Sequence, residues 1–198
     1  MPKAASFSPE DLTARALAQF WRHGYHATSM DDLVKATTIS RHGIYKTFGG
    51  KKALFVACFE TYQDAVVSPA FSAVETATAD LSSIAAYFEL QISAGETEGL
   101  PGPGCFVANS ATEVAPHDAD VQAQVARHNT RLHRGFEAAI RNEIATRGSA
   151  TMADPVDLAH ICVVFANGLW SMSRTVDDAE ELRGTVRVFL TCLKRMLS

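Results

Sequence analysis

The sequence predicts an all-α fold, and three observations support this prediction. Apolar residues recur at spacings of three and four through most of the 198 residues, which is the period of one helix face. No useful length of chain alternates apolar and polar residues as a half-buried strand would. Glycine and proline gather between the periodic stretches, where they end helices and form loops. Together the stretches amount to about nine helices.

The first helix is predicted to begin at Ser8 and to end at Gly24. Ser8 is a capping residue, Pro9 stands at the first helical position, and two acidic residues fall in the first turn. An apolar stripe that includes Phe20 and Trp21 follows at helical spacing. Gly24 then supplies a helix stop.

Two short helices joined by a tight turn are predicted between Thr28 and Phe48. Thr28 or Ser29 can cap the first of them, which ends near Ala36. Ser40 caps the second, which makes barely two turns. Its exposed face is predicted to carry Arg41, His42, Tyr45, Lys46 and Thr47. Such side chains suit phosphates and base edges, and a unit of this shape commonly places its second helix in the major groove of DNA.

The polar residues of this unit divide into two expected roles. Base edges are expected to be read by Arg41, His42 and Lys46. Phosphates are expected to be bound by Thr28, Ser29, Tyr45, Thr47 and Lys51. Lys51 begins the next helix, where free backbone N–H groups also favour a phosphate. Taken singly, each residue is also explained as a solvated surface group.

This part of the chain resembles the TetR/AcrR family of transcriptional regulators. The resemblance follows an ordered series: ALAQFW, Gly24-Tyr25, Thr28-Ser29-Met30, Asp32-Leu33, Ser40, Gly43, Tyr45, Phe48, Lys51 and Ala53-Leu54. Two positions depart from the family pattern, because Thr38 stands where a turn glycine is usual and Gly50 where a capping Ser or Asn is usual. Since glycine adopts a positive φ at little cost, Thr38 is expected to alter the turn.

The resemblance implies a two-part regulator. Residues 1–50 would form a helix-turn-helix DNA-binding domain, and residues 51–198 a helical effector-binding and dimerisation domain. A dimer would bind a palindromic operator on double-stranded DNA and would be released by a small-molecule effector, more often as a repressor than as an activator.

Charge divides the chain near the same place, a few residues further on. Residues 1–60 hold eight basic and five acidic residues, a net charge of +3, whereas the other 138 residues hold ten basic and seventeen acidic residues, a net charge of −7. A basic head on an acidic body is what a DNA-contacting head requires, because the body is then repelled by the phosphates.

Neither a metal site nor a disulfide framework is expected from the four cysteines, Cys58, Cys105, Cys162 and Cys192. They form no C-x-x-C pair, no His lies at metal-ligand spacing, and no cofactor motif is present. The first twelve residues lack the apolar core of a signal peptide, and no run approaches the length of apolar chain that a membrane span needs. We expect a cytoplasmic protein with reduced thiols.

The helix that begins at Lys51 is predicted to link the head to the rest of the chain, and Pro69 is expected to kink or restart it. A further helix is predicted from Asp80 to Gly95, followed by a loop over residues 95–104 and a helix over residues 105–115. Residues 119–147 then keep helical spacing as one helix of about 42 Å.

The last two helices are predicted over residues 155–174 and from Asp177 or Asp178 onward. The first is apolar nearly all round and the second has a broad apolar face, so both need cover. A packed monomeric core is one explanation. A homodimer through residues 155–197 is the other, and the family resemblance implies it.

An effector pocket is expected between the linking helix and the helices of the body. Its candidate lining residues are Phe59, Tyr62, Phe88, Cys105, Phe106, Asn109, Phe136, Phe165 and Trp170. Each of the aromatic residues alone is also explained by core packing. Together they favour an apolar or aromatic effector, and no cluster of Arg or Lys is expected on these helices to meet an anionic group.

Cys105 allows two interpretations. In the first turn of a helix, N–H groups and the helix dipole lower the pKa of a thiol, and the stretch GCFVANSATEVAPHD looks like a subgroup of TetR-like regulators whose cysteine responds to electrophiles or oxidants. Alternatively, Cys105 is a small buried hydrophobe, as Cys58, Cys162 and Cys192 are expected to be on their apolar stripes.

Two other functions compete with a ligand-responsive regulator. One is a helical thiol enzyme using Cys105 with His117 or His128, although no spacing fixes a general base beside the thiol, so no catalytic residue is expected. The other is an architectural DNA-binding dimer without an effector, which a closed body would favour.

Overall fold

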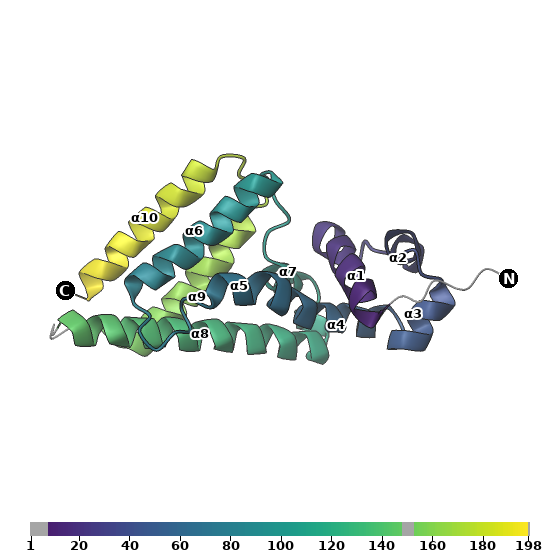
Figure 1. Ribbon diagram of the computed structural model, residues 1–198, viewed down its shortest axis with the longest axis horizontal. Helices are drawn as coiled ribbons and strands as arrows, with labels where there is room; N and C mark the ends of the chain where they lie inside the picture. The colour runs from purple at the N-terminus through teal and green to yellow at the C-terminus, as the bar shows by residue number, and fades with distance from the viewer. Residues whose placement is uncertain (1–7, 148–152, 198) are drawn as a thin grey trace.

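The computed structural model describes residues 8–147 and 153–197, and this part of the chain contains helices and no strand. The prediction that the first twelve residues lack the apolar core of a signal peptide therefore falls partly on residues 1–7, which lie outside the described residues. Figure 1 shows a small head at one end, a body at the other, and a helix that runs from head to body.

The helices occupy the predicted stretches. They are α1 (Pro9–His23), α2 (Met30–Thr37), α3 (Arg41–Phe48), α4 (Lys51–Tyr62), α5 (Ser68–Phe71), α6 (Leu81–Glu98), α7 (Phe106–Glu113), α8 (Ala119–Arg147), α9 (Pro155–Met172) and α10 (Ala179–Met196). Because α4 and α5 are one continuous helix through a π turn at Gln63–Val67, the described residues form the nine helices that the sequence predicts. The all-α prediction is confirmed.

Local capping explains where the head helices begin. Ser8 Oγ accepts a hydrogen bond from Asp11 N at 3.1 Å, and Ser40 Oγ accepts one from Gly43 N at 3.1 Å. Of the two candidate caps for α2, Ser29 is the one used, in a reciprocal capping box with Asp32. These bonds are made within four residues of the chain, which is why the sequence predicts them.

The turn between α2 and α3 contains the unusual Thr38. Its backbone lies in the left-handed region, with φ 61° and ψ 17°, a conformation that costs a β-branched residue about 1–2 kcal/mol. Arg15 on α1 holds it there, because its Nη1 donates to Thr38 Oγ1 at 3.1 Å and to Thr37 O at 3.3 Å. Thr38 therefore adopts the left-handed conformation that a glycine would take in this turn.

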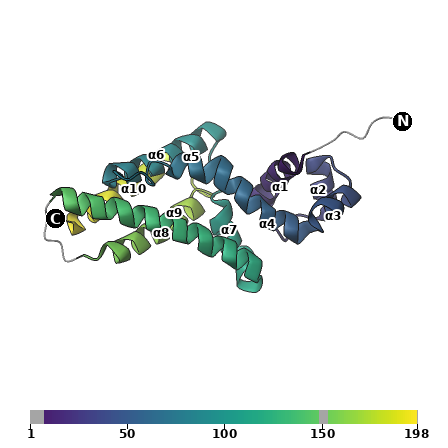
Figure 2. The same cartoon turned by 60° about the horizontal axis from the view of Figure 1, so that its bottom comes forward.

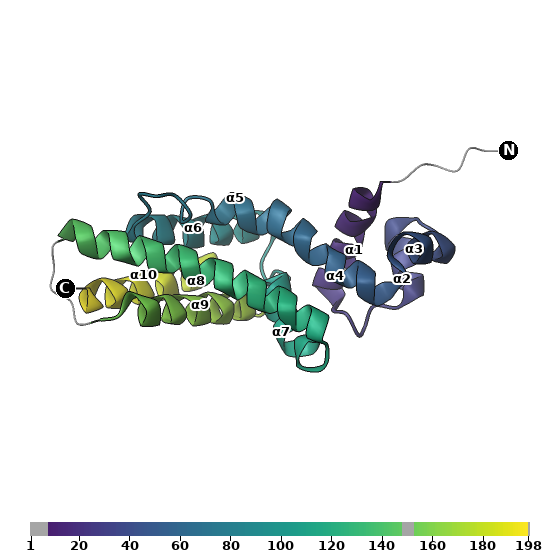
Figure 3. The ribbon, with the colours of Figure 1, turned by 90° about the horizontal axis from the view of Figure 1, so that it is seen from below.

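The linking helix continues through Pro69 instead of stopping. A proline has no N–H and its ring clashes with the carbonyl four residues earlier, so an ordinary α-turn is unfavourable before Pro69. The π turn at Gln63–Val67 widens the helix one step ahead of it, and α5 then extends the same axis along the body (Figure 3). The helix therefore accommodates Pro69 by a π turn at Gln63–Val67, where the sequence predicts a kink or a restart at Pro69 itself.

The body is built around α8, a helix of 29 residues, or about 44 Å at 1.5 Å per residue. It runs along the body with α9 beside it and also packs on α6 and α7 (Figures 2 and 3). The core beneath it includes the fully buried Phe71, Phe88 and Phe136. One boundary differs from the prediction: α6 passes through Gly95 and ends at Glu98, since a glycine inside a helix costs only about 1 kcal/mol.

The last two helices leave apolar side chains exposed on the single chain. They are Ile161, Val164 and Met172 on α9 and Val188 and Met196 on α10. Cys192 on α10 is also exposed, so its predicted place in the core is wrong, whereas Cys58 and Cys162 are buried as predicted. By length and composition, α9 is the one helix in the described residues that could cross a membrane, and 33% of it is buried inside the fold.

We predict that Gly135→Ala destabilises the body. Gly135 lies on α8 under the end of α5, and a Cβ there would lie 2.6 Å from Phe71 Cε1 and 3.3 Å from Val74 Cγ1. Overpacking of this kind costs about 1–3 kcal/mol. Urea unfolding at a fixed protein concentration measures the free energy of unfolding.

Gly95→Ala is the matched control for this substitution. It also lies within a helix, but a Cβ there meets only Leu100 Cδ2 at 3.6 Å, an ordinary contact. Gly95→Ala should raise the free energy of unfolding by about 0.5–1 kcal/mol. Equal effects of the two substitutions would show that close packing at Gly135 is not the constraint.

Candidate nucleic-acid interface and candidate ligand pocket

The outer face of α3 carries the predicted base-reading residues. Arg41, His42, Tyr45, Lys46 and Thr47 are all exposed, whereas Ile44 on the opposite face is fully buried and fixes the helix on the head. Arg41 Nη2 lies 2.9 Å from Asp31 Oδ1, an exposed ion pair of the kind that contributes little. Arg41 is therefore free to exchange Asp31 for another acceptor.

Lys51 and the start of α4 form a second part of this surface. Gly50, at φ 147°, gives α4 no side-chain cap, so its first N–H groups are not used by a capping side chain. Lys51 Nζ lies 4.2 Å from the centroid of the Tyr25 ring, and partial burial lowers the pKa of Lys51 while Glu113 and Asp32 act in the opposite direction. An uncapped helix start beside a lysine is favourable for a phosphate.

The predicted phosphate-binding hydroxyls differ in accessibility. Ser29 is exposed, and its Oγ lies 2.6 Å from Asp32 Oδ2. The Thr47 hydroxyl is exposed and donates to Gly43 O at 2.9 Å within its own helix. Thr28 is fully buried, and its hydroxyl donates to Gly24 O at 2.7 Å. The prediction that the Thr28 side chain binds a phosphate is therefore wrong, because this hydroxyl holds the turn between α1 and α2.

A carboxylate from the body holds the head at this same turn. Glu113 at the end of α7 accepts hydrogen bonds from the backbone N–H of Tyr25 at 3.0 Å and of His26 at 2.7 Å. A side chain at Gly24 would prevent this approach, because a Cβ there would lie 2.9 Å from Glu113 Oε2. No sequence signal marks Glu113, which is one polar residue among others on its helix.

Three further contacts, made by Trp21 and Lys52, join the head side to the body. Trp21 Nε1 on α1 donates to Gly104 O at 2.9 Å, in the segment just before α7. Lys52 Nζ on α4 lies 2.8 Å from both Asp118 and Asp120 before and at the start of α8, and the bond from Lys52 lowers the pKa of Asp118. Head and body thus meet through named polar contacts as well as through α4.

A cavity of about 330 Å³ lies in the body against these contacts. Of the nine residues predicted to line an effector pocket, Tyr62, Cys105 and Trp170 line it. Further lining residues include Trp21, Tyr87, Leu100, Gly104 and His128. Because Trp21 and Gly104 are both in the wall, the bond between α1 and the body borders the cavity.

The other six predicted lining residues lie elsewhere. Phe88, Phe106 and Phe136 are fully buried in the aromatic core, and Phe59, also buried, borders a smaller cavity beside α8. Phe165 stacks on Phe189 with ring centroids 3.8 Å apart, and Asn109 Nδ2 donates to Pro103 O at 2.8 Å. These six residues are therefore not in the wall of the 330 Å³ cavity, because an aromatic residue on an apolar helix face packs equally well in a core or beside a cavity.

The buried polar groups of the cavity are held neutral. Burial lowers the pKa of His128 to about 4, and its Nδ1 lies 2.9 Å from Gln63 Nε2. Burial also raises the pKa of Tyr62 and of Tyr87, whose hydroxyl accepts a hydrogen bond from Trp170 Nε1 at 3.2 Å. At neutral pH these side chains offer hydrogen bonds without charge.

Cys105 is buried at the start of α7, and its thiol is less acidic than the sequence predicts. Its Sγ accepts a hydrogen bond from Ala108 N at 3.5 Å, which favours the thiolate. Burial has the larger effect and raises the pKa of Cys105. The predicted lowering of this pKa is wrong, because the helix N-terminus does not compensate for the loss of water.

No group of three or more His, Cys, Asp or Glu residues in the described part of the chain is placed to hold a metal ion. His128 borders the same cavity as Cys105, but it is paired with Gln63. His117 belongs to the short 3₁₀ turn at Ala115–His117 and does not line the cavity.

Two family models match the chain. One described as bacterial regulatory proteins of the tetR family matches residues 12–58, and one described as the tetracyclin repressor-like C-terminal domain matches residues 81–189. The HTH-type transcriptional repressor ComR of Escherichia coli is 34% identical over 117 residues, which cover 58% of this chain and 55% of ComR. The match thus spans about half the length of that relative.

Solved structures show the same fold over nearly the whole chain. The regulator CifR, as a cysteine mutant with a 26-bp double-strand operator DNA, is similar with a TM-score of 0.77 and 22% identity over 100% of this chain and 98% of that chain. A TetR regulatory protein from Rhodobacter sphaeroides has a TM-score of 0.81 and 20% identity, covering 94% of this chain and 98% of that chain.

Proposed function

The chain belongs to the TetR family of bacterial transcriptional regulators, and on this premise we propose that it represses transcription as a homodimer on a palindromic operator. A small apolar or aromatic molecule in the cavity of the body would release it. The observation that carries the proposal is the exposed polar face of α3 beside the uncapped start of α4. That surface offers cations and free N–H groups where phosphates and base edges would lie.

In this proposal the head, residues 1–50, binds DNA and residues 51–198 sense the effector and dimerise. Base edges are read by Arg41, His42 and Lys46. The phosphate contacts come from Ser29, Tyr45, Thr47 and Lys51, without Thr28, whose hydroxyl is buried. A regulator of this kind works in the cytoplasm, where it meets DNA, and needs neither a cofactor nor a catalytic residue.

The homodimer would form through α9 and α10, within residues 155–197. Val164 is 72% exposed and Val188 is 66% exposed on the single chain, and three more large apolar residues on these helices are close to half exposed. Pairing α9 and α10 with their two-fold copies would bury these side chains in a four-helix interface.

The cavity supports a sensor in preference to an architectural protein without an effector. A volume of about 330 Å³ is at the lower end of the range for small-molecule sites. Its buried histidine and tyrosines are neutral, so an apolar or aromatic molecule would enter without removing water from a charged side chain. Because Trp21 and Gly104 line the wall, an occupant that shifts the segment before α7 would also shift α1.

Such a shift releases DNA only when the effector binds one head orientation better than the other. The linking helix begins beside α3, so a tilt of α4 changes the distance between the two recognition helices of a dimer. An electrophilic effector is the second candidate, because Cys105 lines the cavity and an electrophile held there would lie beside its thiol.

We predict that Arg41→Ala and Lys46→Ala each weaken binding to an operator selected from random duplex DNA by the native protein. Loss of a base contact costs about 1–3 kcal/mol, or about tenfold to a hundredfold in affinity. Fluorescence anisotropy over about 50–200 mM salt measures affinity and salt dependence. Arg141→Ala, which removes the same charge from α8 of the body, should leave both unchanged. Native binding that does not vary with salt would contradict the proposal.

For the electrophilic effector, the expected result is that N-ethylmaleimide releases the native protein from the selected operator and does not release Cys105→Ser. Since burial raises the pKa of Cys105, the rate of release should increase between pH 7 and pH 9. Cys192→Ser is the control, because Cys192 is exposed on α10 and away from the cavity. Release of Cys105→Ser at the native rate would show that this thiol is not the sensor.

A further inference from the structure

A second cavity, of about 580 Å³, opens along α8 and shares no lining residue with the 330 Å³ cavity, which we call the effector pocket. We name this second cavity the arginine groove. It is lined by Val74, Glu75, Thr76, Arg127, Thr130, Arg131, Arg134, Gly135 and Ala138. The sequence prediction that no cluster of Arg or Lys lies on the body helices is wrong, because positions 127, 131 and 134 are spaced by four and three and share one helix face.

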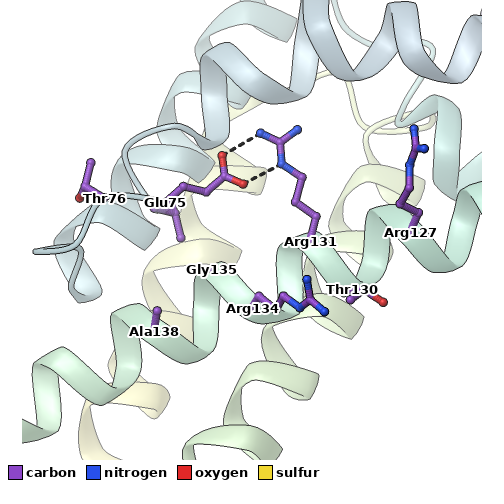
Figure 4. A pocket seen from close by; sticks show the side chains of 9 residues that line it. Glu75, Thr76, Arg127, Thr130, Arg131, Arg134, Gly135 and Ala138 are labelled. Atoms are coloured by element: carbon purple, nitrogen blue, oxygen red, sulfur yellow. Dashed lines mark hydrogen bonds and ion pairs between the residues drawn. The ribbon is translucent and has the colours of Figure 1, made fainter.

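The arginine groove carries an excess of positive charge. Arg131 is paired with Glu75 through two bonds of 2.7 Å, one from Nε and one from Nη2 (Figure 4). Arg127 and Arg134 make no hydrogen bond or ion pair with any residue in 8–147 or 153–197. Among residues 8–147 and 153–197, these two guanidinium groups therefore have no carboxylate bonded to them. Arg127 and Arg131 also line the adjoining smaller cavity with Glu60 and Asp64, and the pKa of Arg131 is raised first by its bond to Glu75 and then by the nearby charges of Glu75 and Asp64.

The shape of the groove suits an anion with an apolar part. Figure 4 shows the side chains of Arg127 and Arg131 leaving α8 in the same direction. Ala138 supplies an exposed small apolar group beside them, whereas Val74 and Gly135 are buried. A guanidinium binds the oxygens of a carboxylate or phosphate with two parallel hydrogen bonds, and the apolar lining favours an organic body on such a head group.

Arg131 also connects the groove to the linking helix. Its Nη1 donates to Gln63 Oε1 at 3.3 Å and to Ser68 Oγ at 3.0 Å, residues that begin and follow the π turn. Gln63 in turn bonds His128, which lines the effector pocket. Any ligand that draws Arg131 away from these partners would disturb the π turn, and π turns often occur at functional sites.

We propose that the arginine groove is a second ligand site, which binds a small organic anion through Arg127, Arg131 and Arg134. The anionic oxygens replace Glu75 as the partner of Arg131 and lie between it and Arg127. The apolar part of the ligand rests on Ala138, which is exposed. This site is distinct from the effector pocket and does not depend on the operator or on the effector.

Isothermal titration calorimetry of the full chain tests the site with benzoate, with inorganic phosphate, and with sodium chloride at matched ionic strength. We expect saturable binding of benzoate, weakened about tenfold by Arg127→Gln and by Arg134→Gln, and unchanged by Arg141→Gln, which removes a charge from α8 outside the groove. Saturable phosphate binding with the same arginine dependence would identify the site as one for phosphate esters. Sodium chloride should give no saturable signal.

The benzoate affinity of Glu75→Gln is a second test, which separates binding at the groove from general attraction of anions to the surface. It frees Arg131 and should tighten benzoate binding by at least about threefold. Glu137→Gln removes an equal charge from α8 outside the groove and should leave the affinity unchanged. The proposal is overturned when neither anion binds saturably, or when binding persists at native affinity in the Arg127→Gln/Arg134→Gln double variant, since the ligand then lies elsewhere.

Discussion

The hydrogen bonds from Tyr25 N and His26 N to Glu113 are the contact on which the working of this molecule depends. They join the turn of the DNA-contacting head to the last residue of α7, the helix whose N-cap Cys105 lines the cavity of the body. The Trp21–Gly104 bond and the bonds of Lys52 to two aspartates lie on the same junction. Because of these contacts, the head is attached to the body at several points besides α4. They therefore restrain its orientation relative to the body.

Burial decides the chemistry of the pocket that borders this junction. His128 lies in a dry part of the fold and its pKa is lowered to about 4, while burial raises the pKa of the Cys105 thiol. Both groups stay neutral at pH 7 for the same reason, since a charge without a partner is unfavourable away from water. The wall of this cavity therefore offers shape and neutral hydrogen bonds, whereas the three arginines of the arginine groove lie along α8.

The sequence predicts the helices well because their ends are set by residues close together in the chain, such as Ser29 with Asp32. It predicts the outer face of α3 for the same reason. It does not predict contacts made across long stretches of chain. Arg15 supports Thr38 from α1, and Thr28 is buried by the turn that Glu113 holds. Three of the nine candidate pocket residues lie in the wall of the cavity, because helical periodicity marks which residues face inward and not whether a neighbour fills the space.

Amide hydrogen exchange at Tyr25 and His26, measured by NMR in Glu113→Ala, tests this account most directly. A hydrogen bond to a charged group contributes about 1.5–3 kcal/mol, so both amides should exchange at least about tenfold faster than in the native protein. The N–H of Asp32 donates a hydrogen bond to Ser29 Oγ at 3.1 Å and does not contact Glu113, so it should exchange at the native rate. Unchanged exchange at Tyr25 and His26 would contradict the account, because Glu113 would then not hold the head to the body.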